Sequence, residues 1–375
     1  MRDLTSTFVM RHARLAETLG RHSLAALALN PGPTLTYLTG LHFHLMERPV
    51  VAMFRPGKPP VLVLPELEGA KLAGLPFEVQ AFPYGEDPAS WPGVFAQAAQ
   101  AAGLEGENVG VEPERMRLLE YRYLENAAPG ARFVHADESL ADLRMRKDDG
   151  EIAAMRKAVE IAQQALLATL PSIRAGVSEK QIAAELTAQL LRAGSEPEFP
   201  FSPIVSGGPN SANPHATPSE RLLQVGDLLV IDWGAIFDGY VSDLTRTFAI
   251  GAVEDEFAQI ARIVAQANAA GRQAAGPEIA AEEVDHAARR VIEEAGYGAY
   301  FIHRTGHGLG MEGHEPPYMR SGNSLPLQAG MTFTVEPGIY LPGRGGVRIE
   351  DNLVITLSGA ETLSDLPRHL ITLPA

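Results

Sequence analysis

A four-residue phrase that occurs twice limits the folds available to this 375-residue chain more than any other feature. The copies read Leu223-Gln224-Val225-Gly226 and Leu327-Gln328-Ala329-Gly330, and a largely apolar segment follows each one. Six residues after each final glycine stands an acid, Asp232 in the first copy and Glu336 in the second. Short apolar runs bounded by turn residues are typical of strands, so the repeat predicts one strand unit built twice.

Each copy carries a second acid further along, and a glycine-flanked histidine lies between the copies: Asp243, Glu350 and His307. Four carboxylates and one imidazole have the composition of a two-metal hydrolytic centre. Glycine on both sides of His307 allows the close backbone approach and defined surroundings of a metal-binding histidine. His303 and His314 lie in the same stretch of twelve residues, and this clustering favours a functional over a structural role.

The first acidic pair is expected on a hairpin whose loop is Asp238-Gly239, a strong short-range hairpin signal. Counting outward from that loop places Asp243 opposite Gly234 and diagonal to Asp232, on one face of the hairpin, roughly 7–8 Å apart at the backbone. Gly234 is then expected to leave room for ions. A longer loop would change this register. The alternative of two solvent-facing acids is disfavoured because the strand of Asp232 is apolar on both faces and a buried carboxylate needs a partner.

The second pair is expected at the end of an alternating strand (Glu336) and beyond a glycine-rich turn (Glu350). Arg348 lies two residues before Glu350 and therefore shares its face. Two kinds of role stay open for this arginine. The first is functional, either anchoring a substrate carboxylate or carbonyl or orienting Glu350, and the second is a structural salt bridge.

Other catalytic motifs are absent or misleading. Residues 308–313 match GxGxxG, but Pro316-Pro317 excludes the helix that a dinucleotide site requires. The chain contains no GxSxG elbow and no GxxxxGK[ST] loop.

Composition excludes several further classes. A formal net charge of −15 argues against a nucleic-acid surface, because binding phosphates takes clustered Lys and Arg. The lack of cysteine excludes disulfides, a cysteine nucleophile and cysteine-ligated metals. The N-terminus lacks a secretion signal, and no run of about 18 apolar residues occurs. We therefore expect a cytoplasmic protein that binds neither nucleic acid nor membrane.

The length and patterning predict two domains, 1–138 and 139–375, with a polar boundary at 137–149. The first domain is expected to be mixed α/β, with a hairpin between the apolar runs 50–54 and 61–64. The second is expected to contain two similar halves about a pseudo-twofold axis, each with two helices and one strand unit. The predicted helices are 152–166 and 178–194 in the first half and 257–267 and 284–295 in the second.

In these acids, histidines and arginine the chain resembles M24 metallopeptidases of the pita-bread fold, in the Xaa-Pro dipeptidase (prolidase) and aminopeptidase P branch. Leu143-Arg144-Met145-Arg146-Lys147 followed by Glu151-Ile152 resembles the entry into that family's catalytic domain. The preceding part resembles the creatinase-type N-terminal domain. The resemblance covers nearly the whole chain and implies an α+β fold.

The resemblance also implies roles for individual residues. The family's five metal ligands fall on Asp232, Asp243, His307, Glu336 and Glu350. Its substrate-side histidines fall on His215, His303 and His314, and its active-site arginine on Arg348. Glu336 also accepts and donates the proton in the family. One departure is Gly313, where a branched aliphatic residue is usual, and this departure implies a looser pocket wall beside His314.

The implied activity is hydrolysis of the Xaa-Pro bond of dipeptides or peptide N-termini by a dinuclear metallopeptidase. Mn²⁺ is the expected metal, with Co²⁺ or Zn²⁺ as alternatives. The compact length slightly favours dipeptidase over aminopeptidase P. The resemblance also implies a homodimer, and a polar loop with His42, His44, Glu47 and Arg48 either is solvated or reaches a neighbouring pocket.

Three alternatives remain open. The first is a metal-free, creatinase-like C–N hydrolase, which does not keep all five ligands. The second is a catalytically inactive binding protein on the same fold. The third is a methionine aminopeptidase, which the long N-terminal domain disfavours.

Overall fold

The computed structural model describes residues 4–375 and divides into two compact units, Met1–Arg144 and Met145–Ala375. The predicted boundary between residues 138 and 139 lies inside helix α5 (Asp137–Arg144). That segment is polar in sequence, but it buries Leu140 and Leu143 and so belongs to the first unit as a helix. No helix among residues 4–375 combines the length and apolar character needed to cross a membrane.

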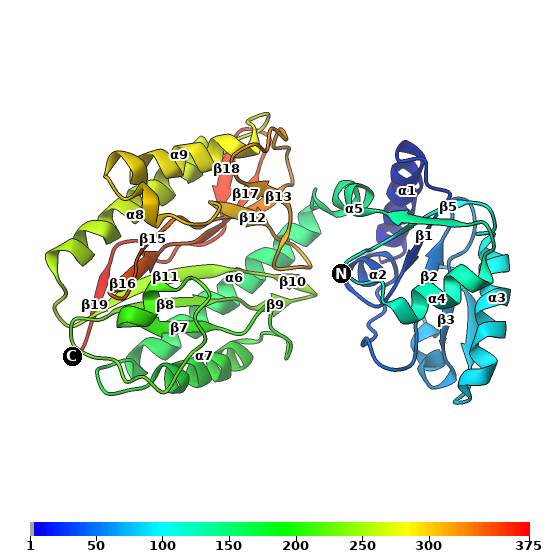
Figure 1. Cartoon of the computed structure of the whole chain (residues 1–375), viewed down its shortest axis with the longest axis horizontal. Coiled ribbons are helices and arrows are strands. Elements are labelled where there is room, and N and C mark those ends of the chain that lie inside the picture. The colour runs from blue at the N-terminus through cyan, green and yellow to red at the C-terminus, as the bar shows by residue number, and fades with distance from the viewer. Residues whose placement is uncertain (1–3) are drawn as a thin grey trace. The chain divides into compact units, whose positions relative to one another are not determined.

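The N-terminal unit contains one six-stranded mixed sheet with the order β4-β3-β2-β1-β5-β6 (Figure 1). Its strands are β1 (Ala26–Leu29), β2 (Val51–Phe54), β3 (Val61–Pro65), β4 (Gln80–Tyr84), β5 (Asn108–Val111) and β6 (Arg132–His135). Its other helices are α1 (Leu4–Arg21), α2 (Pro33–Thr39), α3 (Trp91–Ala102) and α4 (Leu118–Ala127). The predicted hairpin is confirmed, since β2 and β3 pair antiparallel. Phe95 of α3 and Leu124 of α4 pack with strand residues such as Val63 in the core of this unit.

The C-terminal unit has two halves, each with a helix pair and a sheet, and the strands lie between the two helix pairs (Figure 1). The first half contains α6 (Asp149–Thr169), α7 (Glu179–Ala193), β7 (Ile204–Gly207), β8 (Leu228–Trp233), β9 (Ile236–Phe237), β10 (Tyr240–Val241) and β11 (Leu244–Ile250). The second contains α8 (Asp255–Ala274), α9 (Ala281–Glu294), β12 (Gly306–Gly308), β13 (Glu315–Met319), β14 (Thr332–Val335), β15 (Gly338–Leu341), β16 (Gly345–Arg348), β17 (Asp351–Ile355) and β18 (Ala360–Thr362). Strand β19 (Ile371–Leu373) returns to the first sheet, whose order is β19-β11-β8-β7. The second sheet has the order β13-β12-β14-β17-β18.

Helix α7 begins and ends where its local sequence predicts. The Ser178 side chain accepts from the amide of Gln181, and the Gln181 side chain accepts from the amide of Ser178. This capping box satisfies amides that the first helical turn leaves unpaired. Gly194 ends the helix in the left-handed conformation, with φ of 104°.

The doubled phrase forms the same turn in both halves. The amide of Gly226 donates to the carbonyl oxygen of Ile250 (2.8 Å), and the amide of Gly330 donates to that of Ile355 (2.9 Å). Both glycines have positive φ, 97° and 88°, which explains why glycine stands there twice. Each turn therefore ties the start of an inner strand, β8 or β14, to the end of its partner, β11 or β17.

The first acidic hairpin has the predicted register. Phe237 pairs with Tyr240, and further out Asp232 pairs with Thr245. The expected reason for Gly234 was wrong, however. A Cβ atom there would lie 2.0 Å from the Ser242 carbonyl oxygen, so this glycine permits close approach of the two backbones rather than space for ions.

Candidate metal centre

The four repeat acids and His307 converge within the C-terminal unit. Asp232 is in β8, Glu336 directly follows β14, and His307 is the central residue of β12. Asp243 and Glu350 directly precede β11 and β17. Among the described residues, three groups have ligand atoms within 4.8 Å of one another: Asp232, Asp243 and Glu350; His307, Glu336 and Glu350; and Asp243, His307 and His314.

His307 lies between an acid of the first half, Asp243, and an acid of the second half, Glu336. Its Nε2 is 3.2 Å from Glu336 Oε1 and 3.7 Å from Asp243 Oδ2. Its Nδ1 lies 3.1 Å from the Gly308 carbonyl oxygen, a contact that orients the ring with Nε2 toward the acids. The flanking glycines are required by close packing, because a Cβ at Gly306 would lie 1.9 Å from the Thr334 carbonyl oxygen.

The carboxylates are in an environment that opposes negative charge. Burial raises the pKa of Asp243 well above its ordinary value, and the neighbouring carboxylates raise it further. Burial and neighbouring carboxylates likewise raise the pKa of Glu350. Glu336 differs, because a hydrogen bond from His307 and the charge of that ring outweigh burial and lower its pKa to about 2. A positive charge at the centre of the cluster would therefore favour the ionised form of these acids.

The residues fit a divalent metal on the evidence of their own contacts. Asp232 Oδ2 accepts from Arg348 at 2.6 Å, whereas the buried Oδ1 has no hydrogen-bond partner among residues 4–375. An unpartnered carboxylate oxygen beside three other carboxylates is costly unless a cation satisfies it. An oxygen-rich donor set with one imidazole suits Mn²⁺, Co²⁺ or Zn²⁺.

Arg348 donates hydrogen bonds to four protein groups. Besides Asp232, it donates from Nε to Thr245 Oγ1 (3.1 Å) and from Nη1 to the Tyr340 hydroxyl (3.0 Å) and the Pro214 carbonyl oxygen (3.3 Å). In this structure the arginine forms an ion pair with Asp232.

His303 reaches Arg348 through a tyrosine. Its Nδ1 lies 2.7 Å from the Arg304 carbonyl oxygen, and its Nε2 lies 2.9 Å from the Tyr340 hydroxyl. Burial lowers the pKa of His303 and raises that of Tyr340 to about 12. Tyr340 was not predicted as part of the site, although a tyrosine four residues after Glu336 in an apolar strand was a usable signal.

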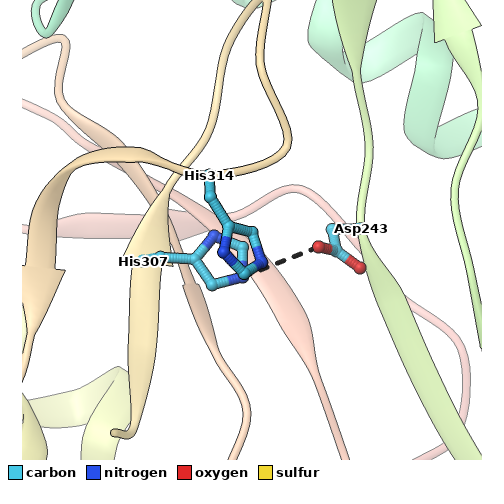
Figure 2. Close-up of side chains that lie close together, drawn as sticks. All are labelled: Asp243, His307 and His314. Atoms are coloured by element: carbon cyan, nitrogen blue, oxygen red, sulfur yellow. Dashed lines mark ion pairs between the residues drawn. The ribbon is translucent and has the colours of Figure 1, made fainter. Parts of the chain in front are cut away.

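The structure also places the other two histidines. The ring of His314 lies over that of His307, with centroids 3.8 Å apart (Figure 2). Arg304 Nη2 donates to its Nδ1 (3.1 Å), and burial, His307 and Arg304 lower its pKa to about 4. His215 is exposed and belongs to none of the three ligand groups found among residues 4–375, but its charge contributes to the lowered pKa of His314.

Two threonines were also missed. Thr245 Oγ1 donates to Glu350 Oε2 (2.7 Å), and Thr334 Oγ1 donates to Glu336 Oε1 (3.2 Å) while accepting from the His307 amide. Each threonine stands two residues from an acid of its own strand unit, so each shares the face of that acid. This spacing was visible in the sequence.

Comparison with known proteins gives matches over nearly the whole chain. Residues 153–357 match Metallopeptidase family M24, and residues 11–146 match the Creatinase/Prolidase N-terminal domain. An Xaa-Pro dipeptidase from Lactobacillus delbrueckii subsp. lactis is 34% identical, over 96% of this chain and 98% of that protein.

Solved structures agree with these matches. The dipeptidase PepE from Mycobacterium ulcerans has a TM-score of 0.90 and 36% identity, covering 99% of both chains. An X-Pro aminopeptidase from Thermotoga maritima has a TM-score of 0.84 and 31% identity, covering 96% of this chain and 99% of that one.

Proposed function

This chain belongs to metallopeptidase family M24, and from that membership and its cluster of acids we propose that it hydrolyses Xaa-Pro bonds, preferentially in dipeptides. The α+β architecture of a creatinase-type N-terminal domain followed by a pita-bread catalytic domain agrees with the prediction. The single observation that carries the proposal is the convergence of four buried or half-buried carboxylates and His307 in overlapping ligand groups, with one oxygen of Asp232 unpartnered among residues 4–375.

The proposed ligands of two divalent ions are Asp232, Asp243, His307, Glu336 and Glu350. Asp243, His307 and Glu350 each belong to two of the three ligand groups, so the groups overlap in one cluster. Mn²⁺ is the proposed metal because oxygen ligands dominate the set, with Co²⁺ or Zn²⁺ as alternatives. Divalent ions in such a centre polarise a peptide carbonyl and make water nucleophilic near neutral pH.

The remaining roles are assigned to side chains around these acids. Glu336, whose pKa is lowered to about 2, is ionised at neutral pH and is the proposed acceptor of the proton from water. The leaving nitrogen of an Xaa-Pro bond carries no hydrogen, so Glu336 then donates that proton to it. His215 and His314 are proposed to hydrogen-bond the carbonyl oxygen as charge develops on it. Arg348 and His303 are proposed to hold Asp232 and the substrate side of the pocket in place.

The preference for dipeptides is supported by the relatives named dipeptidases, although a structural neighbour is an aminopeptidase. Rates on Ala-Pro and Ala-Pro-Ala distinguish the two activities. A homodimer in the cytoplasm completes the proposal, and sedimentation analysis of the purified chain tests the oligomeric state.

The site is tested by Asp243→Asn. This change removes a charge and a metal-binding oxygen, so we expect loss of bound metal and of nearly all Ala-Pro hydrolysis while the fold survives. Metal content by mass spectrometry, circular dichroism and the rate measure these three outcomes. Asp365→Asn, at an exposed acid of the same unit, is the matched control and is expected to behave like the parent.

Parental hydrolysis by Asp243→Asn would show that the site assignment is wrong. A parent that contains no divalent metal and is unaffected by chelator would favour the metal-free C–N hydrolase instead.

A further inference from the structure

The main chain of Asp243 is held by a side chain from the other half of its unit. The amide of Asp243 donates to Asn352 Oδ1 (3.0 Å), and Asn352 Nδ2 donates to the carbonyl oxygen of Asp243. Asn352 is fully buried in β17, where its own main chain pairs with Thr334. A single side-chain amide thus bonds Asp243 as a neighbouring strand would.

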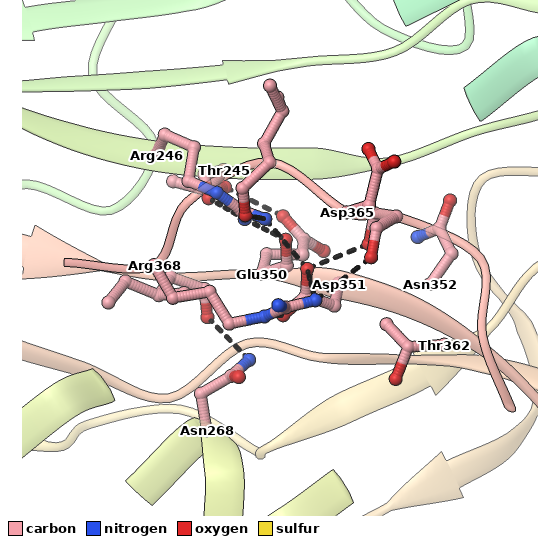
Figure 3. Close-up of polar contacts among 12 residues, drawn as sticks. Thr245, Arg246, Asn268, Glu350, Asp351, Asn352, Thr362, Asp365 and Arg368 are labelled. Carbon is pink, nitrogen blue, oxygen red and sulfur yellow. Dashed lines mark hydrogen bonds and ion pairs between the residues drawn. The ribbon is translucent and has the colours of Figure 1, made fainter. Parts of the chain in front are cut away.

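The main chain of Glu350, a residue of the second half, is in turn held by an arginine of the first half. Arg246 of β11 is 4% exposed, and its Nη1 donates to the carbonyl oxygens of Glu350 (2.7 Å) and Thr245 (2.8 Å). Its Nη2 donates to Asp351 Oδ1 (2.8 Å) and to the Leu366 carbonyl oxygen (3.0 Å) (Figure 3). Because a guanidinium presents its donors in a rigid planar fork, these acceptors are fixed relative to one another.

The segments that carry Asp243 and Glu350 also form hydrogen bonds directly to each other. The Glu350 amide donates to the Thr245 carbonyl oxygen (3.1 Å), and these two residues form an isolated antiparallel bridge. The arrangement is reciprocal. Asn352 follows Glu350 by two residues yet holds Asp243, and Arg246 follows Asp243 by three residues yet holds Glu350.

We propose that Asn352 and Arg246 are positioning residues that fix the separation of the Asp243 and Glu350 carboxylates and so set the affinity for the ion those ligands share. The inference rests on the proposed metal centre. The group of Asp232, Asp243 and Glu350 takes ligands from both halves, so its geometry depends on how the halves are joined. Loss of partners that orient ligands commonly costs about 10–100-fold in metal affinity.

The test is calorimetric titration of the ion-free, full-length chain with Mn²⁺ alone, for the parent, Asn352→Ala and Arg246→Lys. Lysine keeps a positive charge beside Asp351 but loses the planar fork. We expect the Kd of one Mn²⁺ to rise about 10–100-fold in each variant. We also expect kcat on Ala-Pro to recover at saturating Mn²⁺. Circular dichroism of the ion-free variants is expected to match the parent, which separates a loss of affinity from a loss of folded protein.

Matched controls exist in the same unit. Asn323 also bonds two main-chain groups, the Tyr318 carbonyl oxygen (2.7 Å) and the Leu325 amide (3.3 Å). Arg221 also forms a two-bond ion pair, with Asp227. Asn323→Ala and Arg221→Lys are expected to bind Mn²⁺ with parental affinity.

Parental Mn²⁺ affinities in folded Asn352→Ala and Arg246→Lys overturn the positioning role. A parent that binds no Mn²⁺ instead overturns the proposed function, so the two failures are distinguishable. If Asn352→Ala does not fold, Asn352→Leu replaces it, because leucine keeps the volume and removes both hydrogen bonds. Parental affinity in that variant, or in Arg246→Lys, overturns the proposal equally.

Discussion

The Tyr340 hydroxyl joins two of the side chains that surround the acids. It accepts a hydrogen bond from Arg348, and it donates to His303 Nε2, since Nδ1 of that ring faces a carbonyl oxygen. Its pKa is raised to about 12 by burial, so it keeps its hydrogen across the range of ordinary assays. Because one hydroxyl bonds both side chains, the positions of Arg348 and His303 depend on each other.

Tyr340→Phe removes this hydroxyl and little else. We expect kcat on Ala-Pro to fall about 10–100-fold, because Arg348 and His303 lose their common partner. Steady-state kinetics at saturating Mn²⁺ measure the fall, and metal content is expected to remain at two ions per chain.

Tyr297→Phe is the control, since that hydroxyl bonds Glu256 away from the acids. A Tyr340→Phe enzyme as fast as the Tyr297→Phe enzyme would show that the hydroxyl is not needed.

The sequence predicted the relative positions of site residues that belong to one strand unit. It did not predict contacts between residues of the two halves. The shared face of Asp232 and Asp243 follows from hairpin counting alone. The contacts of Asn352 and Tyr340 depend on how strands of different sheets approach, and no local pattern encodes that approach.

At the scale of elements, the hairpin of β8 and β11 depends on one close backbone approach. Gly234→Ala would place a methyl carbon 2.0 Å from the Ser242 carbonyl oxygen and 2.9 Å from Pro200. We expect the free energy of unfolding to fall by about 1–3 kcal/mol or more, since relief requires the backbones to separate. Urea denaturation followed by circular dichroism measures the change.

Gly359→Ala is the matched control, because a Cβ there meets no atom of residues 4–375 within 4 Å. That variant is expected to stay within about 0.5 kcal/mol of the parent. Equal stability of the two variants would contradict the assigned role of Gly234.

Helices with a strong hydrophobic periodicity or clear capping residues were predicted from the sequence, and helices without these signals were not. Helix α7 follows from its capping box and its terminal Gly194. Helix α3 was not predicted because it opens with Trp-Pro-Gly and is otherwise rich in alanine, so its buried face has little contrast in sequence. Helix α5 is short and mostly polar, which made it resemble a linker.

At the scale of the whole molecule, all five proposed ligands belong to the unit Met145–Ala375. Bound ions stabilise the state that binds them, so Mn²⁺ added to the ion-free chain is expected to slow amide hydrogen exchange in that unit. Peptides from residues 4–144 are expected to exchange at unchanged rates. Hydrogen exchange read by mass spectrometry measures both units in one experiment, and equal slowing in both would contradict a metal centre confined to one.

The distribution of the ligands along the duplicated unit also decides when the centre can first exist. Asp232 and Asp243 are synthesised more than a hundred residues before Glu350. A nascent chain therefore carries the first acidic pair while those residues are made, without all the partners that complete either proposed ion site. An ion at the proposed centre would consequently report that both halves have been made and joined.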